Sequence, residues 1–323
     1  MRIHAVFEGG GVKGIALAGA VRAAEESGVQ FDRVAGTSSG AIVASLIAAG
    51  YRGEELRDII EKAPFPKLAG GAVDARSGCK GIVPLMRFLL RKGLFSAKPL
   101  EDWISGLLAA KGVRTFGDLP AGRLRVVASD ITDGRMLVLP DDLPKYGLVA
   151  DAFPVARAVR MSAGIPYFYE PATLGEKRNV VVDGGLLSNF PLWLFDREND
   201  VPAKAGLPAK RVPVIGFQLV GKNDQTPRRI TGPLTMLHAL VATMLEARDE
   251  RYIEQTNRFR TVKIPTLGVR TTAFDLPRET VLRLYQSGYD AGKRFFGRWS
   301  LAGYQKSYDL FVAARKPEPK MMA

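Results

Sequence analysis

Near the N-terminus, the sequence pattern of a strand, a glycine turn and a helix occurs twice in succession. Residues 2–7 (RIHAVF) predict a short buried strand, and a glycine cluster beginning at Gly9 leads from it into a helix over residues 12–27. A second strand is predicted over residues 33–36, and it leads through Thr-Ser-Ser-Gly into an apolar helix over residues 41–49. This alternation favours an α/β layered domain with a largely parallel sheet, whose functional groups gather at the carboxyl ends of the strands.

The rest of the chain continues without an internal repeat or a long low-complexity stretch. Further strands are predicted over residues 123–129, 135–139, 179–182 and 212–219, and further helices over residues 234–258 and 278–298. We expect one domain over residues 1–313, followed by a flexible tail over residues 314–323. The motifs described below lie within residues 3–195, and a basic C-terminal part covers residues 201–313.

The composition indicates a soluble globular protein. Hydrophobic residues make up 46% and charged residues 24% of the 323 residues, and the mean hydropathy is close to zero. These values exclude a disordered chain, a collagen and a polytopic membrane protein. The sequence shows no signal peptide and no apolar run long enough to span a bilayer, and its single cysteine, Cys79, cannot form an internal disulfide. We therefore expect a cytoplasmic protein, either free or peripheral to the inner face of the membrane.

An excess of positive charge lies in the last third of the chain. The formal net charge is +13, and residues 201–323 carry 21 Lys and Arg against 10 Asp and Glu. A basic surface attracts phosphates, either in nucleic acid or in an anionic lipid leaflet, although a merely solvated face has the same composition. The sequence has no zinc-finger spacing, no RNP-like aromatic motif and no run of five basic residues. We therefore expect a membrane surface as a partner and no nucleic acid.

A G-x-S-x-G motif, Gly36-Thr37-Ser38-Ser39-Gly40, lies between the second predicted strand and the helix that follows it. A sharp strand-to-helix turn projects the central Ser38 into a cleft, and glycines at both ends of the motif avoid a clash with the crossing backbone. The nearby helix N-terminus favours negative charge that develops on a substrate. The motif predicts that Ser38 is a nucleophile; the alternative is a serine and glycine turn that only caps a helix.

A glycine-rich segment, Gly9-Gly10-Gly11-Val12-Lys13-Gly14, directly follows the first predicted strand. It has the G-x-G-x-x-G pattern of a dinucleotide site, but that interpretation requires an acidic residue at the end of the second strand, which here ends in Gly36. Consecutive N–H groups on residues without side chains can instead hydrogen-bond an oxyanion. We therefore expect an oxyanion hole in this segment, with Lys13 as a candidate contact for a lipid phosphate.

Two residues are candidates for the base that a serine nucleophile needs. The order Ser38, Asp183, His238 imitates that of an α/β-hydrolase triad, but His238 falls within a predicted periodic helix rather than in a loop. Asp183 ends an apolar strand and precedes Gly184-Gly185, so its carboxylate is expected at the same edge of the sheet as Ser38. We favour a dyad of Ser38 and Asp183, to which an Asx turn at a strand end is the structural alternative.

These three motifs, in this order, resemble those of the patatin-like phospholipase family. That family has a glycine-rich oxyanion segment near the N-terminus, a G-x-S-x-G turn soon after it and a D-G-[AG] motif that carries the aspartate of the dyad. Residues 128–134 (ASDITDG) and 162–171 (SAGIPYFYEP) are also similar to family segments. The resemblance covers residues 3–195 and implies a three-layer α/β/α fold with a central, mostly parallel sheet.

The resemblance assigns a role to each motif. It implies that Ser38 is the nucleophile and Asp183 the proton acceptor in the hydrolysis of acyl esters of phospholipids or other lipids, through an acyl-enzyme and without a metal or another cofactor. The residues of the oxyanion hole would be Gly9, Gly10, Gly11 and Ser39, and the other motif glycines are Gly14, Gly36, Gly40, Gly184 and Gly185. An acyltransferase or a neutral-lipid lipase on the same dyad, and a non-catalytic nucleotide- or lipid-binding module, are the alternatives.

An apolar segment between the motifs carries Arg87 and Arg91. On a helix over residues 82–95 these arginines, four residues apart, share one face, and apolar residues cover most of the rest. Such a helix fits an interfacial lid whose cations contact lipid phosphates, and a core helix with snorkelling arginines has the same pattern. No motif specifies an oligomeric state.

Overall fold

The computed structural model describes residues 1–68, 90–199, 212–221, 230–232, 257–271 and 273–314, and the single residues 236, 239 and 243. Its central sheet has the strand order β10-β9-β1-β2-β4-β8-β7, with β5 paired to β4. The parallel strands are β1 (Arg2–Phe7), β2 (Gln30–Thr37), β4 (Leu124–Asp130), β9 (Val214–Val220) and β10 (Thr261–Pro265). Antiparallel pairing adds β5 (Arg135–Leu139), β7 (Ala172–Leu174) and β8 (Asn179–Asp183). A second, two-stranded sheet contains β3 (Gly93–Phe95) and β6 (Tyr167–Tyr169).

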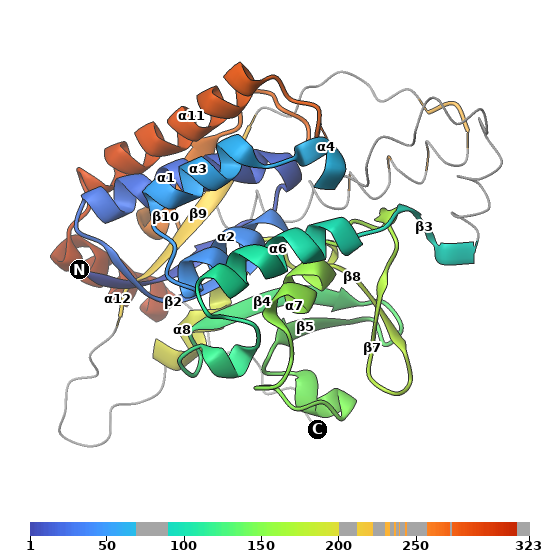
Figure 1. Cartoon of the computed structure of the whole chain (residues 1–323). Helices are drawn as coiled ribbons and strands as arrows, with labels where there is room; N and C mark the ends of the chain where they lie inside the picture. Colours follow the sequence, from blue (N-terminus) through green and yellow to red (C-terminus); the bar gives the residue numbers. More distant parts are fainter. Residues whose placement is uncertain are drawn as a thin grey trace.

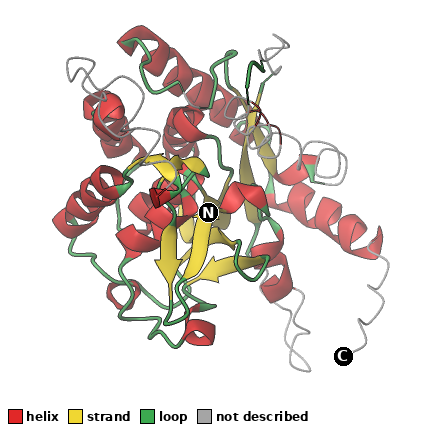
Figure 2. Ribbon diagram, turned by 90° about the vertical axis from the view of Figure 1, so that its right-hand side faces the viewer, coloured by secondary structure: helices red, strands yellow, loops and turns green. Residues whose placement is uncertain are grey.

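Helical segments cover both faces of the central sheet (Figure 1, Figure 2). Alternate residues of β1 show the division, because Ile3 and Phe7 belong to one buried core and Val6 belongs to another. The smaller core lies against Phe190 and Leu192, in the segment that leads into α8 (Trp193–Asn199). The larger core is covered by α1 (Ile15–Glu26), α2 (Ser39–Ala48), α3 (Gly53–Lys62), α6 (Lys98–Ala110), α7 (Val155–Ser162) and α11 (Arg278–Phe296). The fold is therefore the expected three-layer α/β/α arrangement with a mostly parallel sheet.

Short helices and one longer helix complete the described chain. They are α4 (Phe65–Leu68), α12 (Leu301–Ala314) and the 3-10 helices η1 (Gly11–Gly14), η2 (Phe116–Asp118), η3 (Leu143–Tyr146), η4 (Gly184–Leu186) and η5 (Arg258–Arg260). Among the helices described, none is both long enough and apolar enough to cross a membrane.

The predicted elements agree with the structure where the sequence pattern is local. The predicted strands 123–129, 135–139, 179–182 and 212–219 are confirmed as β4, β5, β8 and β9, and the predicted helix 278–298 as α11. The helix predicted over residues 12–27 differs at its start, because Gly11 has a positive φ of 56° and a 3-10 turn precedes α1. The pattern does not predict β6, β7, β10, α3, α6, α7, α8 or α12. Residues 234–258 lie largely outside the described residues, as does the tail after Ala314.

Most of the segment expected to form an interfacial helix, including Arg87, lies outside the described residues. The described end of that segment contradicts the prediction, because Gly93–Phe95 forms the strand β3 and not the end of a helix. Lys92, with a φ of 59°, ends the helical backbone just before the strand. The aromatic ring of Phe95 then packs at 5.0 Å from that of Phe168 in β6. Packing against β6 therefore overrides the helical periodicity of this segment.

Candidate active site

Ser38 lies in a strained turn between the end of β2 and the start of α2. Its φ of 53° and ψ of −124° are rare for a residue with a side chain and place the hydroxyl outside the helix. A Cβ at Gly36 would lie 2.3 Å from the carbonyl oxygen of Gly40, and a Cβ at Gly40 would lie 2.2 Å from that of Phe7. Both positions therefore require glycine, and the sharp turn expected from G-x-S-x-G is present.

The hydroxyl of Ser38 donates a hydrogen bond of 2.7 Å to Oδ2 of Asp183. Both side chains are buried, with exposed fractions of 5% for Ser38 and 1% for Asp183. The two residues are 145 positions apart, and sheet register brings them together: Thr37 pairs with Val127, and the next residue of β4, Ala128, pairs with Asp183. The strand β8 that carries Asp183 is antiparallel to β4. Asp183 therefore reaches Ser38 from the end of an antiparallel strand, and not from the parallel part of the sheet.

Burial raises the pKa of the Asp183 carboxyl to about 6, while hydrogen bonds from the Ser38 hydroxyl and the Gly185 N–H oppose that shift. The raised pKa means that the carboxylate holds a proton more strongly than an exposed aspartate does. It is still ionised at neutral pH, so it can accept a proton from a hydroxyl in direct contact with it.

The amides of the glycine-rich segment have different partners. The N–H of Gly9 donates to the carbonyl of Asn189 at 3.1 Å, and the N–H of Gly10 donates to Oγ of Ser39 at 3.0 Å. These two amides already have acceptors within the protein, which differs from their expected role in an oxyanion hole. Gly11 turns the chain with its positive φ, and a Cβ there would lie 2.1 Å from the carbonyl oxygen of Thr271. Gly11 and Ser39 both line the pocket beside Ser38.

Ser162 holds the turn at Ser38 in place by hydrogen bonds. The N–H of Ser38 donates to Oγ of Ser162 at 2.8 Å, and the Ser162 hydroxyl donates to the carbonyl of Val127 at 2.6 Å. Ser162 is fully buried at the C-terminal end of α7. Ser162 begins the segment over residues 162–171 that is similar to a family segment, but no sequence signal pointed to its role.

Asn189 holds the glycine-rich segment to the loop that follows Asp183. Its carbonyl accepts from the Gly9 N–H, and its side-chain amide donates to the Gly9 carbonyl at 3.1 Å. Nearby, the Thr37 hydroxyl donates to the carbonyl of Ser188 at 3.0 Å. The three motifs are thus held to one another by hydrogen bonds. No sequence signal pointed to Asn189, because its partners lie far away in the chain.

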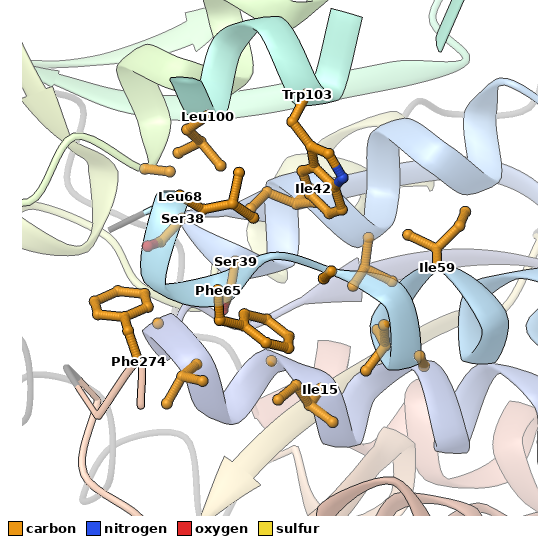
Figure 3. A pocket seen from close by; sticks show the side chains of 18 of the residues that line it. Ile15, Ser38, Ser39, Ile42, Ile59, Phe65, Leu68, Leu100, Trp103 and Phe274 are labelled. Atoms are coloured by element: carbon orange, nitrogen blue, oxygen red, sulfur yellow. The ribbon is translucent and has the colours of Figure 1, made fainter. Parts of the chain in front are cut away.

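A pocket begins at Ser38, and it holds about 840 Å³ of empty space when the open solvent at its mouth is included. Its wall is formed by apolar and aromatic side chains of α1, α2, α3, α4 and α6, and by Tyr169 and Phe274 (Figure 3). Among the described residues that line it, the side chains carry no charge, and the hydroxyls are those of Ser38, Ser39 and Tyr169. This composition suits a hydrocarbon chain.

The remaining motif glycines have close contacts that a side chain would disturb. A Cβ at Gly14 would lie 2.6 Å from the Cβ of Ser39, and a Cβ at Gly184 would lie 2.2 Å from the carbonyl oxygen of Val127. Gly185 is buried and donates its N–H to Oδ1 of Asp183 at 2.8 Å. These glycines therefore allow the backbone segments of the site to approach one another closely.

The cations that were expected to contact lipid phosphate and the two histidines of the chain are not gathered in one place among the described residues. The stem of Lys13 runs beside Gly10, and the exposed Arg91 lies 3.5 Å from the half-buried Glu170 in an ion pair. His4 faces the smaller core, where its ring lies 5.0 Å from that of Phe195, while His238 lies outside the described residues. The direct contact between Ser38 and Asp183 leaves no space for an imidazole between their oxygens. Within the described residues, no group of three or more His, Cys, Asp or Glu side chains could hold a metal ion.

Comparison with known proteins decides the family. A family model described as patatin-like phospholipase matches residues 5–196, which include all three motifs. The chain belongs to the patatin-like phospholipase family. Membership of this family supports lipid acyl hydrolysis as the general activity of the protein.

This patatin-like protein is similar to several relatives over most of its length. It is 44% identical to the uncharacterized protein YqhO of Bacillus subtilis, over 93% of this chain and 100% of YqhO. It is 30% identical to the uncharacterized NTE family protein Rv2565 of Mycobacterium tuberculosis, over 76% of this chain and 37% of that protein. Among solved structures, VipD from Legionella pneumophila has a TM-score of 0.53 at 19% identity, over 91% of this chain and 66% of VipD. The likeness to VipD supports the patatin fold.

Proposed function

We propose that this patatin-like protein is a serine acyl hydrolase that cleaves fatty-acyl esters of phospholipids or related lipids, with Ser38 as the nucleophile and Asp183 as the general base. The observation that carries the proposal is the 2.7 Å hydrogen bond from Ser38 Oγ to Asp183 Oδ2, made at the end of an apolar pocket. A bound lipid would place its ester carbonyl beside Ser38 and its hydrocarbon chain in the pocket.

In the acylation step, Asp183 Oδ2 accepts the hydroxyl proton of Ser38 while Oγ forms a bond to the ester carbonyl carbon. Negative charge develops on the carbonyl oxygen. The N–H groups of Gly11 and Ser39 are the proposed donors to it, since those of Gly9 and Gly10 have acceptors within the protein. The C–O bond then breaks, the proton of Asp183 passes to the departing alcohol oxygen, and Ser38 keeps the acyl group.

In the deacylation step, a water molecule takes the place of the alcohol. Asp183 accepts one of its protons while the water oxygen attacks the acyl carbon. The bond from Ser38 Oγ to that carbon breaks, the proton returns from Asp183 to Oγ, and the fatty acid leaves. Asp183 can act as the base in both steps because burial has raised its pKa toward neutrality. The transfer of a proton from the hydroxyl or from water to its carboxylate therefore costs less free energy than transfer to an exposed aspartate.

We also propose that the protein acts on lipid at a membrane surface. Leu94 of the β3 and β6 sheet is exposed and follows two cations, Arg91 and Lys92. The same sheet adjoins the pocket, because Phe168 stacks on the pocket residue Phe274 at 5.5 Å between ring centroids. The positive charge of residues 201–323 would add attraction to anionic lipids.

The test of the catalytic proposal is labelling by a fluorophosphonate, followed by analysis of the products from phosphatidylglycerol and phosphatidylcholine vesicles. We expect one covalent adduct on Ser38, release of free fatty acid, and loss of both in Ser38→Ala. His238→Ala should keep most of the activity, whereas an inactive but folded His238→Ala would favour the triad. The adduct is expected to form without added metal.

The same assay distinguishes the alternatives. Transfer of the acyl group to an added lysolipid in place of water would identify an acyltransferase, and a preference for triacylglycerol over phospholipid would identify a neutral-lipid lipase. A folded protein that neither reacts with the fluorophosphonate nor releases fatty acid would contradict the proposal and favour a non-catalytic binding module.

A further inference from the structure

The pocket that begins at Ser38 follows α2 away from the site. Ser38, Ile42 and Leu46 are four residues apart, so they lie along one side of α2, and all three line the pocket. With a rise of about 1.5 Å per residue, Ile42 lies roughly 6 Å and Leu46 roughly 12 Å from Ser38 along the helix axis. Figure 3 shows Ser38 at one end of the pocket, with Ile42 and Ile59 farther along it.

Helix α1 starts at the same end of the pocket as α2, and α3 runs back toward it. A side chain at Gly14, just before α1, would contact Ser39 at the start of α2. The first residue of α3, Gly53, packs against Arg22 near the far end of α1, since a Cβ there would lie 2.4 Å from the Cα of Arg22. Leu56, one turn into α3, therefore lines the end of the pocket that is remote from Ser38.

The described residues at this remote end are buried. Leu46 and Leu56 have exposed fractions of 3% and 1%, and the connection over residues 49–52 joins their two helices beyond them. Tyr51 in this connection is buried, and its hydroxyl donates to the carbonyl of Leu107 in α6 at 2.8 Å. A hydrocarbon chain that enters from Ser38 therefore meets leucine side chains and not solvent.

We infer that Leu46 and Leu56 set the length of the acyl chain that the site accepts. This inference rests on the proposed acyl hydrolase function and adds a substrate preference to it. The roughly 12 Å from Ser38 to Leu46 is shorter than the roughly 15 Å that the acyl chains of one leaflet span, which is half of a hydrocarbon core of about 30 Å. Medium-length chains fill the pocket, whereas the longest membrane acyl chains must bend or stay partly outside.

The chain-length profile follows from the burial of methylene groups. Each methylene that enters the pocket contributes roughly fourfold to kcat/KM, because burying it is worth about 0.8 kcal/mol. That gain stops where the chain reaches Leu46 and Leu56. The wild type should therefore show kcat/KM rising from butyryl to a medium-chain ester and no further rise to the palmitoyl ester.

The experiment measures kcat/KM of the full chain for p-nitrophenyl esters from butyryl to palmitoyl. Leu46→Ala and Leu56→Ala each deepen the pocket and should raise the ratio of palmitoyl to octanoyl kcat/KM at least fourfold, while Leu46→Phe should lower it at least fourfold. Ile47→Ala is the matched control, because Ile47 is as buried as Leu46 on the same helix but does not line the pocket. It should lower the melting temperature to a similar extent without changing the ratio.

A second measurement needs no variant: fatty acids of increasing length compete with fluorophosphonate labelling of the wild type. Protection should strengthen with each methylene and then level off. Protection that keeps rising fourfold per methylene up to palmitate, or folded Leu46 and Leu56 variants with an unchanged ratio, would overturn the inference while leaving hydrolysis intact. Failure of the wild type to hydrolyse any of the esters would overturn the proposed function instead.

Discussion

At the scale of single residues, Asp183 has an environment that makes it a stronger base at a cost in stability. It is buried beside Ser38, and burial raises its pKa from 3.8 to about 6. As the proposed general base it must be ionised. We therefore expect kcat/KM to fall about tenfold per pH unit below pH 6 and to level off above it. A pH profile with a soluble ester measures this, and an acid limb centred near pH 4 would contradict the assignment.

Asp183→Asn should abolish hydrolysis and yet make the protein more stable at neutral pH. The folded pKa lies above the unfolded one, so this carboxyl stabilises the fold below about pH 4 and that contribution is lost as the pH rises through about 6. The shift of roughly two units corresponds to about 3 kcal/mol. Urea unfolding of wild type and variant at pH 4, 5.5 and 7 tests the prediction. The stability of the variant relative to wild type should rise by about that amount across the range, whereas parallel curves would refute it.

Ser162→Ala should impair catalysis because Ser162 positions Ser38, although Ser162 itself does not contact the substrate in the proposed mechanism. It leaves the Ser38 N–H buried without its acceptor, at a cost of about 1–3 kcal/mol, in a turn whose φ of 53° is already strained. We expect kcat and the rate of fluorophosphonate labelling to fall tenfold or more, with little change in KM. Ser45→Ala is the control, because Ser45 is equally buried in α2 but bonds only to the Ile42 carbonyl. An equal loss in both variants would show a merely structural role.

At the scale of elements, α1 is held against α11 by residues without side chains. A Cβ at Gly288 of α11 would lie 1.7 Å from the carbonyl oxygen of Ala16, and a Cβ at Gly19 of α1 would lie 1.9 Å from that of Tyr285. The two helices therefore pack backbone against backbone, and α1 continues directly from η1, which contains Gly11. The position of the glycine-rich segment depends on this contact.

Gly288→Ala should therefore push the two helices apart and destabilise the fold by about 1–3 kcal/mol or more. Gly106→Ala in α6 is the matched control, since a Cβ there would have no neighbour within 4 Å. Alanine is favoured over glycine inside a helix, so this control should be neutral or more stable by up to about 1 kcal/mol. Thermal unfolding of both variants measures the difference, and similar melting temperatures would contradict the packing argument.

At the scale of the whole molecule, the exposed residues beside the pocket are expected to meet a lipid surface. Arg91→Glu combined with Lys92→Glu should weaken binding to anionic vesicles tenfold or more, because each basic residue near such a surface contributes about 1 kcal/mol. The ratio of vesicle hydrolysis to soluble ester hydrolysis should fall accordingly. Vesicle sedimentation and both activity assays measure these effects.

The control for this prediction changes the net charge by the same amount, but near the amino-terminal ends of the strands, away from Ser38. The control variant is Arg2→Glu with Lys306→Glu. Arg2 is the first residue of β1. Lys306 belongs to α12, which packs on the start of β9 because the Val214 N–H donates a hydrogen bond to the hydroxyl of Tyr304. Both cations are exposed. Equal weakening by the two pairs would show that only net charge matters and that the proposed surface is wrong.

Features that depend on neighbours in the chain can be predicted from the amino-acid pattern alone. The strand, turn and helix units follow from short-range periodicity and from glycines. The turn at Ser38 follows from five consecutive residues, because nearby backbone atoms leave no space for a side chain at Gly36 or Gly40. The segment over residues 82–95 shows the limit of this reasoning, because pairing with β6 converts its end into a strand. Local periodicity cannot predict pairing with a strand that lies more than seventy residues away in the chain.

Which groups meet, and how deeply they are buried, depends on how the elements pack together. Asp183 contacts Ser38 because an antiparallel strand ends opposite Ala128, and no local pattern specifies that register. The same holds for the acceptors of the Gly9 and Gly10 amides and for a pocket assembled from several helices. The pKa of Asp183 depends on these contacts as well. Distances across the sheet and the removal of water are properties of the packed whole, since they arise from residues that are far apart in the chain.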